Sequence, residues 1–219
     1  MKGFIMKKLV VFLFVVSITL PLYAQTQIPE YRFASGRWGF TGDRLFQDDP
    51  GARLAKVNFK VPQSGSILYE FNIRYEGGAE DGHGGVGLHV FSDTAYNGAS
   101  WGCGKSYLLW LNYDENPISK AIPKGLSAQV YRSYTNSRME LVQSISLSNY
   151  ERFLTAENLG APVSFRIEVY GNTGDIRVYD PTDSEQYYLI KVEPRDVPLK
   201  GDWVALRTNG LKASFALGL

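Results

Sequence analysis

The sequence has almost no cysteine, and this scarcity excludes a fold that is cross-linked by disulfide bonds. Its single cysteine, Cys103, has no partner within the chain, so the fold must depend on its hydrophobic core. Cys103 lies in the glycine-rich stretch "ASWGCGKS", where no histidine is near enough in sequence to activate a nucleophile. A buried, unreactive thiol is therefore favoured, and an intermolecular disulfide is the alternative.

Long apolar runs are also lacking, apart from one near the N-terminus. Lysines precede the run Leu9–Leu20, which is too short to cross a bilayer comfortably, and Ala24 offers a small residue for cleavage before Gln25. This pattern predicts a signal peptide over residues 1–24, with a retained membrane anchor as the alternative. We expect an exported protein of the periplasm, cell envelope or extracellular space, with no membrane span after cleavage.

An excess of positive charge is missing as well. Removal of the leader, which carries Lys2, Lys7 and Lys8, leaves a slight excess of acidic residues and no polybasic patch. The composition therefore argues against nucleic acid as a partner.

Histidine is scarce, and its two occurrences do not form a recognisable metal motif. His83 and His89 are six positions apart, without a third ligand or a helical His-x-x-x-His frame, so we expect neither a metal site nor a cofactor. The carboxylates nearby, Glu76, Glu80 and Asp81, lie in or beside a turn that nothing holds rigid. We therefore assign no catalytic residue, since a glycosidase needs two rigidly spaced carboxylates.

The sequence does contain many short segments in which apolar and polar residues alternate. Alternation with a period of two is typical of strands with one buried face. In "SILYEFNIRYE" the inward set is Ile67, Tyr69, Phe71, Ile73 and Tyr75, and in "PVSFRIEVYG" it is Val163, Phe165, Ile167 and Val169. Further strands are expected at 54–61, 85–91, 106–113, 126–133, 138–146, 175–180, 186–193, 202–208 and 211–217.

Turn residues separate nearly all of these segments, which predicts an all-β antiparallel sandwich. The expected domain spans residues 36–219 and follows a flexible leader at 25–35. One short connecting helix is expected to begin at Ser148, because Glu151 three positions later completes a capping box.

The order of these segments resembles the concanavalin A-like lectin/glucanase superfamily, including its laminin-G-like and keto-disaccharide-hydrolase-like relatives. The resemblance covers residues 36–218 and rests on "RWGFTGDRLFQDD", "YEFNIRYEGG", "VGLHVFSD", "SYLLWLNYD", "VSFRIEVYGNTGDIRVYD" and "GDWVALRTNGLKASF". It implies a jelly roll that binds sugars or proteins on a concave face or its rim. The carboxylate string of the family-16 glucanases is missing, and Ala216 follows Phe215 where an aspartate often helps to bind calcium, so a structural calcium is not supported.

The strongest candidate for ligand binding is Trp110 in "SYLLWLNYD". If Tyr107, Leu109 and Leu111 face the core, Trp110 faces outward and can stack on a sugar ring, unless a connecting loop covers it. By the same parity, and if the strands follow one another in order, the outer face also presents a set of polar residues. These predicted binding residues are Arg74, His89, Gln129 and Tyr131.

Three functions remain open at this stage. The first is a non-catalytic binding domain for a carbohydrate or an envelope or surface protein. The second is a structural subunit of an extracytoplasmic assembly such as a filament sheath or coat. The third is a glycoside hydrolase whose acids come from separate strands. An open cleft with converging aromatic and carboxylate side chains would favour sugar binding or hydrolysis, and a filled groove with a large apolar exterior would favour assembly. Two carboxylates at glycosidase spacing would favour the third function.

Overall fold

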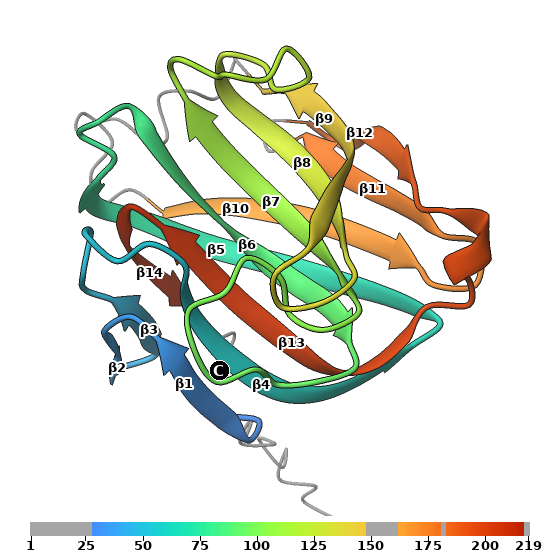
Figure 1. Ribbon diagram of the computed structural model, residues 1–219, viewed down its shortest axis with the longest axis horizontal. Helices are drawn as coiled ribbons and strands as arrows, with labels where there is room; N and C mark the ends of the chain where they lie inside the picture. The colour runs from blue at the N-terminus through green and yellow to red at the C-terminus, as the bar shows by residue number, and fades with distance from the viewer. Residues whose placement is uncertain (1–27, 148–161, 181–182, 217–219) are drawn as a thin grey trace, which may run out of the picture.

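The computed structural model describes residues 28–147, 162–180 and 183–216. Two seven-stranded antiparallel sheets stack face to face, which confirms the predicted all-β sandwich (Figure 1). The predicted signal peptide and the predicted helix at Ser148 lie outside the described residues. In the described part of the chain, no helix is long and apolar enough to cross a membrane.

The first sheet contains the segment of the chain that bears most of the predicted site. Its strands, in order, are β1 (Tyr31–Ser35), β4 (Ala55–Ser64), β13 (Lys200–Asn209), β6 (His83–Ser92), β7 (Ser106–Asp114), β8 (Gly125–Ser133) and β9 (Met139–Ser146). The strands β6 to β9 follow one another in sequence, as expected for hairpin-connected neighbours.

The second sheet is assembled from both ends of the described chain. Its strands, in order, are β12 (Asp183–Lys191), β11 (Asp175–Asp180), β10 (Pro162–Tyr170), β5 (Ser66–Gly78), β14 (Leu211–Ala216), β3 (Arg44–Gln47) and β2 (Trp38–Thr41). A short 3-10 helix, η3 (Pro194–Asp196), connects β12 to β13 across one end of the sandwich.

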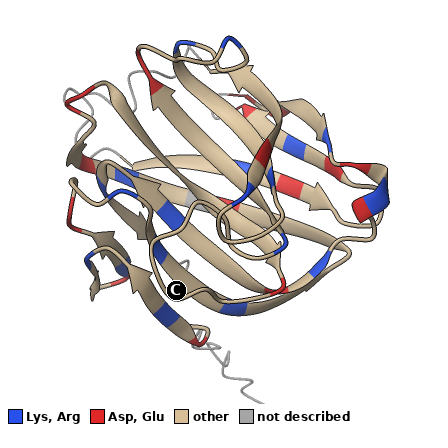
Figure 2. Ribbon diagram, in the orientation of Figure 1, with Lys and Arg blue, Asp and Glu red and all other residues tan. Residues whose placement is uncertain are grey.

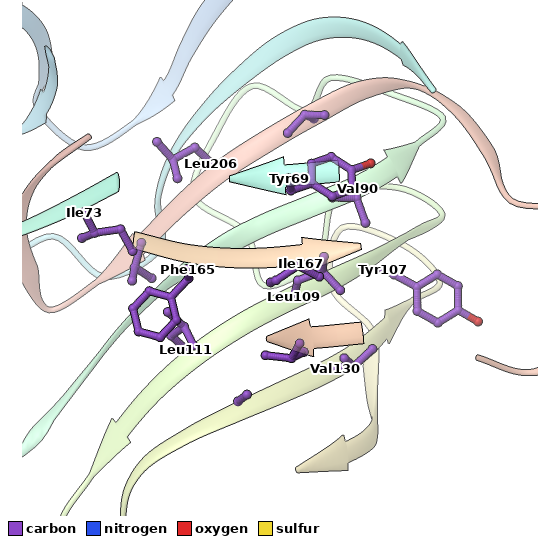
Figure 3. Close-up of a cluster of buried hydrophobic side chains, with 14 of the residues drawn as sticks. Tyr69, Ile73, Val90, Tyr107, Leu109, Leu111, Val130, Phe165, Ile167 and Leu206 are labelled. Atoms are coloured by element: carbon purple, nitrogen blue, oxygen red, sulfur yellow. The ribbon is translucent and has the colours of Figure 1, made fainter. Parts of the chain in front are cut away.

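The core lies between the sheets, and the predicted inward residues of β10 contribute to it. Leu109, Leu111 and Val130 of the first sheet face Phe165 and Ile167 of the second (Figure 3). Phe165 is 5% exposed, so the predicted parity of this strand is confirmed. Burial of such apolar surface is the main stabilising contribution to a fold without disulfides.

The prediction of a flexible leader at 25–35 is wrong for its C-terminal part. Residues Tyr31–Ser35 form β1, which pairs with β4 at the edge of the first sheet. The Tyr31 ring contacts Phe33, Phe40 and Phe59 with centroid distances of 5.3, 5.0 and 6.3 Å. This aromatic cluster gathers residues from three strands, and it holds the segment in the sheet.

Candidate functional site

Three rows of residues run across the outer surface of the first sheet, which we call the polar face. Cross-strand pairing from β4 to β9 aligns one residue of each strand in a row, and alternation directs all of them away from the core. The first row is Lys56, Arg207, Gly87, Trp110, Gln129 and Ser144. The second is Asn58, Ala205, His89, Leu108, Tyr131 and Leu141. The third, from β13 to β9, is Asn209, Gly85, Asn112, Ser127 and Ser146.

Two glycines of β6 allow close packing against β7 on this face. A Cβ at Gly85 would lie 2.2 Å from Cζ2 of Trp110, and a Cβ at Gly87 would lie 2.0 Å from the carbonyl oxygen of Leu109. Such distances leave no space for a side chain. The glycine-rich stretch therefore has a packing role, because Gly85 makes room for the Trp110 indole and Gly87 for the backbone of β7.

Arg207 lies between two tryptophans. Its guanidinium carbon is 5.1 Å from the ring centroid of Trp110 and 5.3 Å from that of Trp101, and Nη1 donates to the Trp101 carbonyl at 2.6 Å. No ion pair joins Arg207 to a described acidic residue, although the side chain is buried. Desolvation lowers the pKa of Arg207 to about 10, so it remains a cation at neutral pH.

The segment between β6 and β7, residues 93–105, covers the β4 and β13 side of the polar face. Figure 1 shows this green segment crossing β13 and β4. The Lys56 ammonium donates to Oγ of Ser100 at 2.6 Å and to the carbonyl of Gly102 at 2.8 Å. The amide of Asn58 donates to the carbonyl of Tyr96 at 3.1 Å. Burial lowers the pKa of Lys56 to about 8.

Trp101 is the more exposed of two aromatic side chains that this segment presents to solvent, with 57% of its surface exposed against 37% for Tyr96. Its backbone is positioned by Arg207, and the neighbouring Gly102 packs closely, since a Cβ there would lie 2.0 Å from the Thr135 carbonyl. Trp101 is not among the binding residues predicted from the sequence. The available signal was its position between small residues of a loop, which is typical of an exposed aromatic on a fixed turn.

Four of the five predicted binding residues lie together on the polar face: His89, Trp110, Gln129 and Tyr131. Their outward direction agrees with the parity argument, but three of them are covered. His89 is 0%, Gln129 1% and Trp110 7% exposed, whereas Tyr131 is partly exposed. For Trp110 the alternative was a covering loop, and the structure places the Arg207 guanidinium against its ring, with Trp101 of the segment 93–105 also in contact with Arg207. Their role in ligand binding stays a prediction.

His89 is held in a neutral state by its surroundings. Its Nδ1 lies 3.0 Å from Oγ of Ser106. Complete burial, together with the positive charges of Lys56 and Arg207, holds the pKa of His89 well below its usual value. In this structure it therefore packs within the polar face as a neutral side chain.

The fifth predicted residue, Arg74, is on the wrong sheet for this site. It lies in β5 of the second sheet, where Nε donates to Oε1 of Glu76 at 2.5 Å. The prediction that Arg74 lines up beside His89 is therefore wrong. The chain crosses from one sheet to the other between β4 and β5, so nearness in sequence does not give nearness on a face.

The polar side chains at and just before the start of β6 contact polar neighbours. Asp81 pairs with Arg53 at 2.6 Å, and His83 lies 3.1 Å from Asp114. Within residues 28–147, 162–180 and 183–216, no three histidine, cysteine or acidic side chains converge on a possible metal position. Cys103 is fully buried, with its sulfur 3.4 Å from the Thr94 carbonyl.

The fold is similar to solved structures of binding modules. A carbohydrate-binding module, CBM66, from Bacillus subtilis aligns with a TM-score of 0.56 at 13% identity over 86% of this chain and 92% of that one. A Bacillus subtilis protein of unknown function with a galectin-like fold gives 0.54 at 14% identity over 90% of each chain. The CBM2 module of the evolved Dit of Lactobacillus casei BL23 phage J-1 gives 0.51 at 14% identity over 83% and 77%.

No family model matches the sequence, and no curated protein sequence matches it either. Identities this low establish a likeness of fold and nothing finer. The chain therefore shares its antiparallel β-sandwich fold with these structures.

Proposed function

We propose that this protein is an exported, non-catalytic carbohydrate-binding domain and that its binding site is on the polar face around Trp101. The observation that carries the proposal is the exposed Trp101 indole, whose position is held by the buried Arg207 cation. A rigid, solvent-facing aromatic ring offers an apolar surface on which the C–H face of a sugar can stack.

Two partly exposed polar side chains of the polar face, Tyr131 and Asn112, would hold the sugar hydroxyls. The Tyr131 hydroxyl donates to Oε1 of Gln129 at 2.7 Å, and Nε1 of Trp110 donates to Oδ1 of Asn112 at 3.0 Å. These bonds fix the orientation of Tyr131 and Asn112 before any ligand arrives. Preorganised polar groups lose little conformational entropy on binding, which favours affinity.

Two further observations support binding over hydrolysis. None of the residues in the three rows of the polar face is an acid, whereas a glycosidase places two carboxylates on either side of the scissile bond. In addition, two of the solved structures with a similar fold are described as carbohydrate-binding or CBM modules.

Export is the second part of the proposal, and it rests on the leader at residues 1–24. Mass spectrometry of the native protein should find an N-terminus within a few residues of Gln25. A native chain that retains Met1 would contradict export.

The binding site is tested by Trp101→Ala in the mature chain, after a glycan array has identified a ligand. We expect an affinity loss of about tenfold or more by calorimetry, with a melting temperature within a few degrees of the wild type, because an exposed ring is removed without leaving a core cavity. Tyr187→Ala is the matched control, since Tyr187 is a 44% exposed aromatic residue of the second sheet.

Equal affinity of the wild type and Trp101→Ala for the glycan would show that the binding site is not on the polar face around Trp101. If the protein binds an envelope protein and no glycan, its ligand is a protein and the proposed carbohydrate-binding function is wrong.

A further inference from the structure

A separate pocket of about 360 Å³ opens at one end of the sandwich. Its walls are the first residues of β7, the last residues of β8 and the segment that contains η3. In Figure 2 this end carries the blue and red colours of η3. The volume lies within the range of sites that hold small ligands.

Positive charge dominates the lining of this pocket. Lys105, Arg132, Arg195 and Lys200 line it, and among its lining residues the only acid is Asp196. Asp196 is already occupied, since the Arg132 guanidinium donates to one of its oxygens and the Tyr107 hydroxyl donates to the other. The Asp196 carboxylate therefore neutralises Arg132 and leaves three cations.

Those three cations, Lys105, Arg195 and Lys200, are exposed and form no ion pair with any acid that the structure describes. Cations gathered around a concave surface produce a local positive potential, which concentrates anions. An anionic group entering the pocket would gain charge-assisted hydrogen bonds without displacing an existing partner.

The pocket also has an apolar floor. Phe91, Tyr107 and Leu199 line it and are 3–5% exposed. An apolar floor below a cationic rim suits a ring that carries an anionic substituent, because the ring covers the floor while the substituent meets the cations.

We propose that this pocket binds an acidic sugar residue, that is, a sugar bearing a carboxylate or a sulfate, so that the preferred glycan is a polyanion. The inference rests on the proposed carbohydrate-binding function, and it adds a second contact region and a charge preference. The segment 93–105 links the two regions, since it carries Trp101 and ends at Lys105.

The test is affinity gel electrophoresis of the mature chain in matched polymers. Polygalacturonate is compared with its fully methyl-esterified form, and dextran sulfate with dextran. We expect retardation by at least one acidic polymer, little by its neutral counterpart, and weakening by added salt, because these contacts are screened. The acidic polymer that retards more identifies carboxylate or sulfate as the preferred group.

The Arg195→Ala/Lys200→Ala double variant should bind the acidic polymer about tenfold more weakly. Its matched control is Lys120→Ala/Lys124→Ala, which removes the same charge from exposed positions of the β7–β8 connection at the opposite end of these strands. The control should bind like the wild type.

Three results would contradict the proposal that this pocket binds an acidic sugar. They are no retardation by either acidic polymer, equal retardation by the acidic and neutral forms, or an equal loss of affinity in both double variants. Trp101→Ala separates the two proposals. If Trp101→Ala binds the acidic polymer normally while Arg195→Ala/Lys200→Ala does not, the result supports the proposal for the pocket and contradicts the proposal that Trp101 binds the glycan. The reverse pattern would overturn the pocket alone.

Discussion

At the scale of single residues, Gly87 shows how a missing side chain shapes the polar face. It stands between Arg207 and Trp110 in the first row, and a Cβ at this position would meet the backbone of Leu109 and Trp110 in β7. A sequence pattern indicates only that such a glycine is unusual in a strand. The close approach of the β7 backbone supplies the reason.

We predict that Gly87→Ala destabilises the protein by about 1–3 kcal/mol, because the new Cβ would meet backbone atoms that cannot move aside. The free energy of unfolding in urea measures this loss. Gly39→Ala in β2 is the control, since no atom lies within 4 Å of its added Cβ, and its effect should stay within about 0.5 kcal/mol. Equal losses in the two variants would show that the close approach at Gly87 is not the cause.

At the scale of elements, the segment 93–105 packs over the first sheet and is hydrogen-bonded to it. Lys56 of β4 is its main anchor, through donated bonds to Ser100 and Gly102. The position of Trp101 depends on the bonds from Lys56 and Arg207. A change that loosens the segment 93–105 should therefore also alter the geometry of the proposed binding site.

The Lys56 anchor predicts a pH dependence. Desolvation lowers the pKa of Lys56 from 10.5 to about 8 in the folded chain. Between pH 8 and 10.5 the unfolded chain therefore binds more protons than the folded chain, and the contribution of Lys56 to stability rises with pH. Relative to Lys56→Met, the wild type should gain about 1–2 kcal/mol between pH 7.5 and 9.5 in urea denaturation.

Lys60→Met controls for this effect, because Lys60 lies four positions further along β4 with its side chain 54% exposed. Tyrosine ionisation affects all three chains in the same way and cancels from the differences. A constant difference between the wild type and Lys56→Met over this pH range would show that Lys56 is not desolvated.

At the scale of the whole molecule, stability comes from the core between the sheets. We predict that Phe165→Ala, which opens a cavity there, costs about 3–5 kcal/mol, whereas Arg166→Ala costs less than about 1 kcal/mol. Arg166 lies next to Phe165 but faces outward, with 42% of its side chain exposed and an ion pair to Glu168 at 2.5 Å. Chemical denaturation of both variants measures the contrast, and similar losses would contradict the assignment of the two faces.

The sequence by itself determined which residues of each central strand point toward or away from the core. Phe165 inward and His89 and Trp110 outward follow from a period of two, which is a local property of an extended backbone. Most strands from β4 to β14 were predictable for the same reason. The strands β1 to β3 were not, because their short aromatic segments are recognisable only through partners such as Phe59.

Only the tertiary structure decided which strands share a sheet and which outward residues reach solvent. Arg74 lies on the second sheet because strand pairing is set by contacts between distant parts of the chain. His89 and Trp110 are covered because the segment 93–105, which connects their two strands, and Arg207, which is remote in sequence, pack on the polar face. Exposure depends on what lies above a strand, and no periodicity within the strand carries that information.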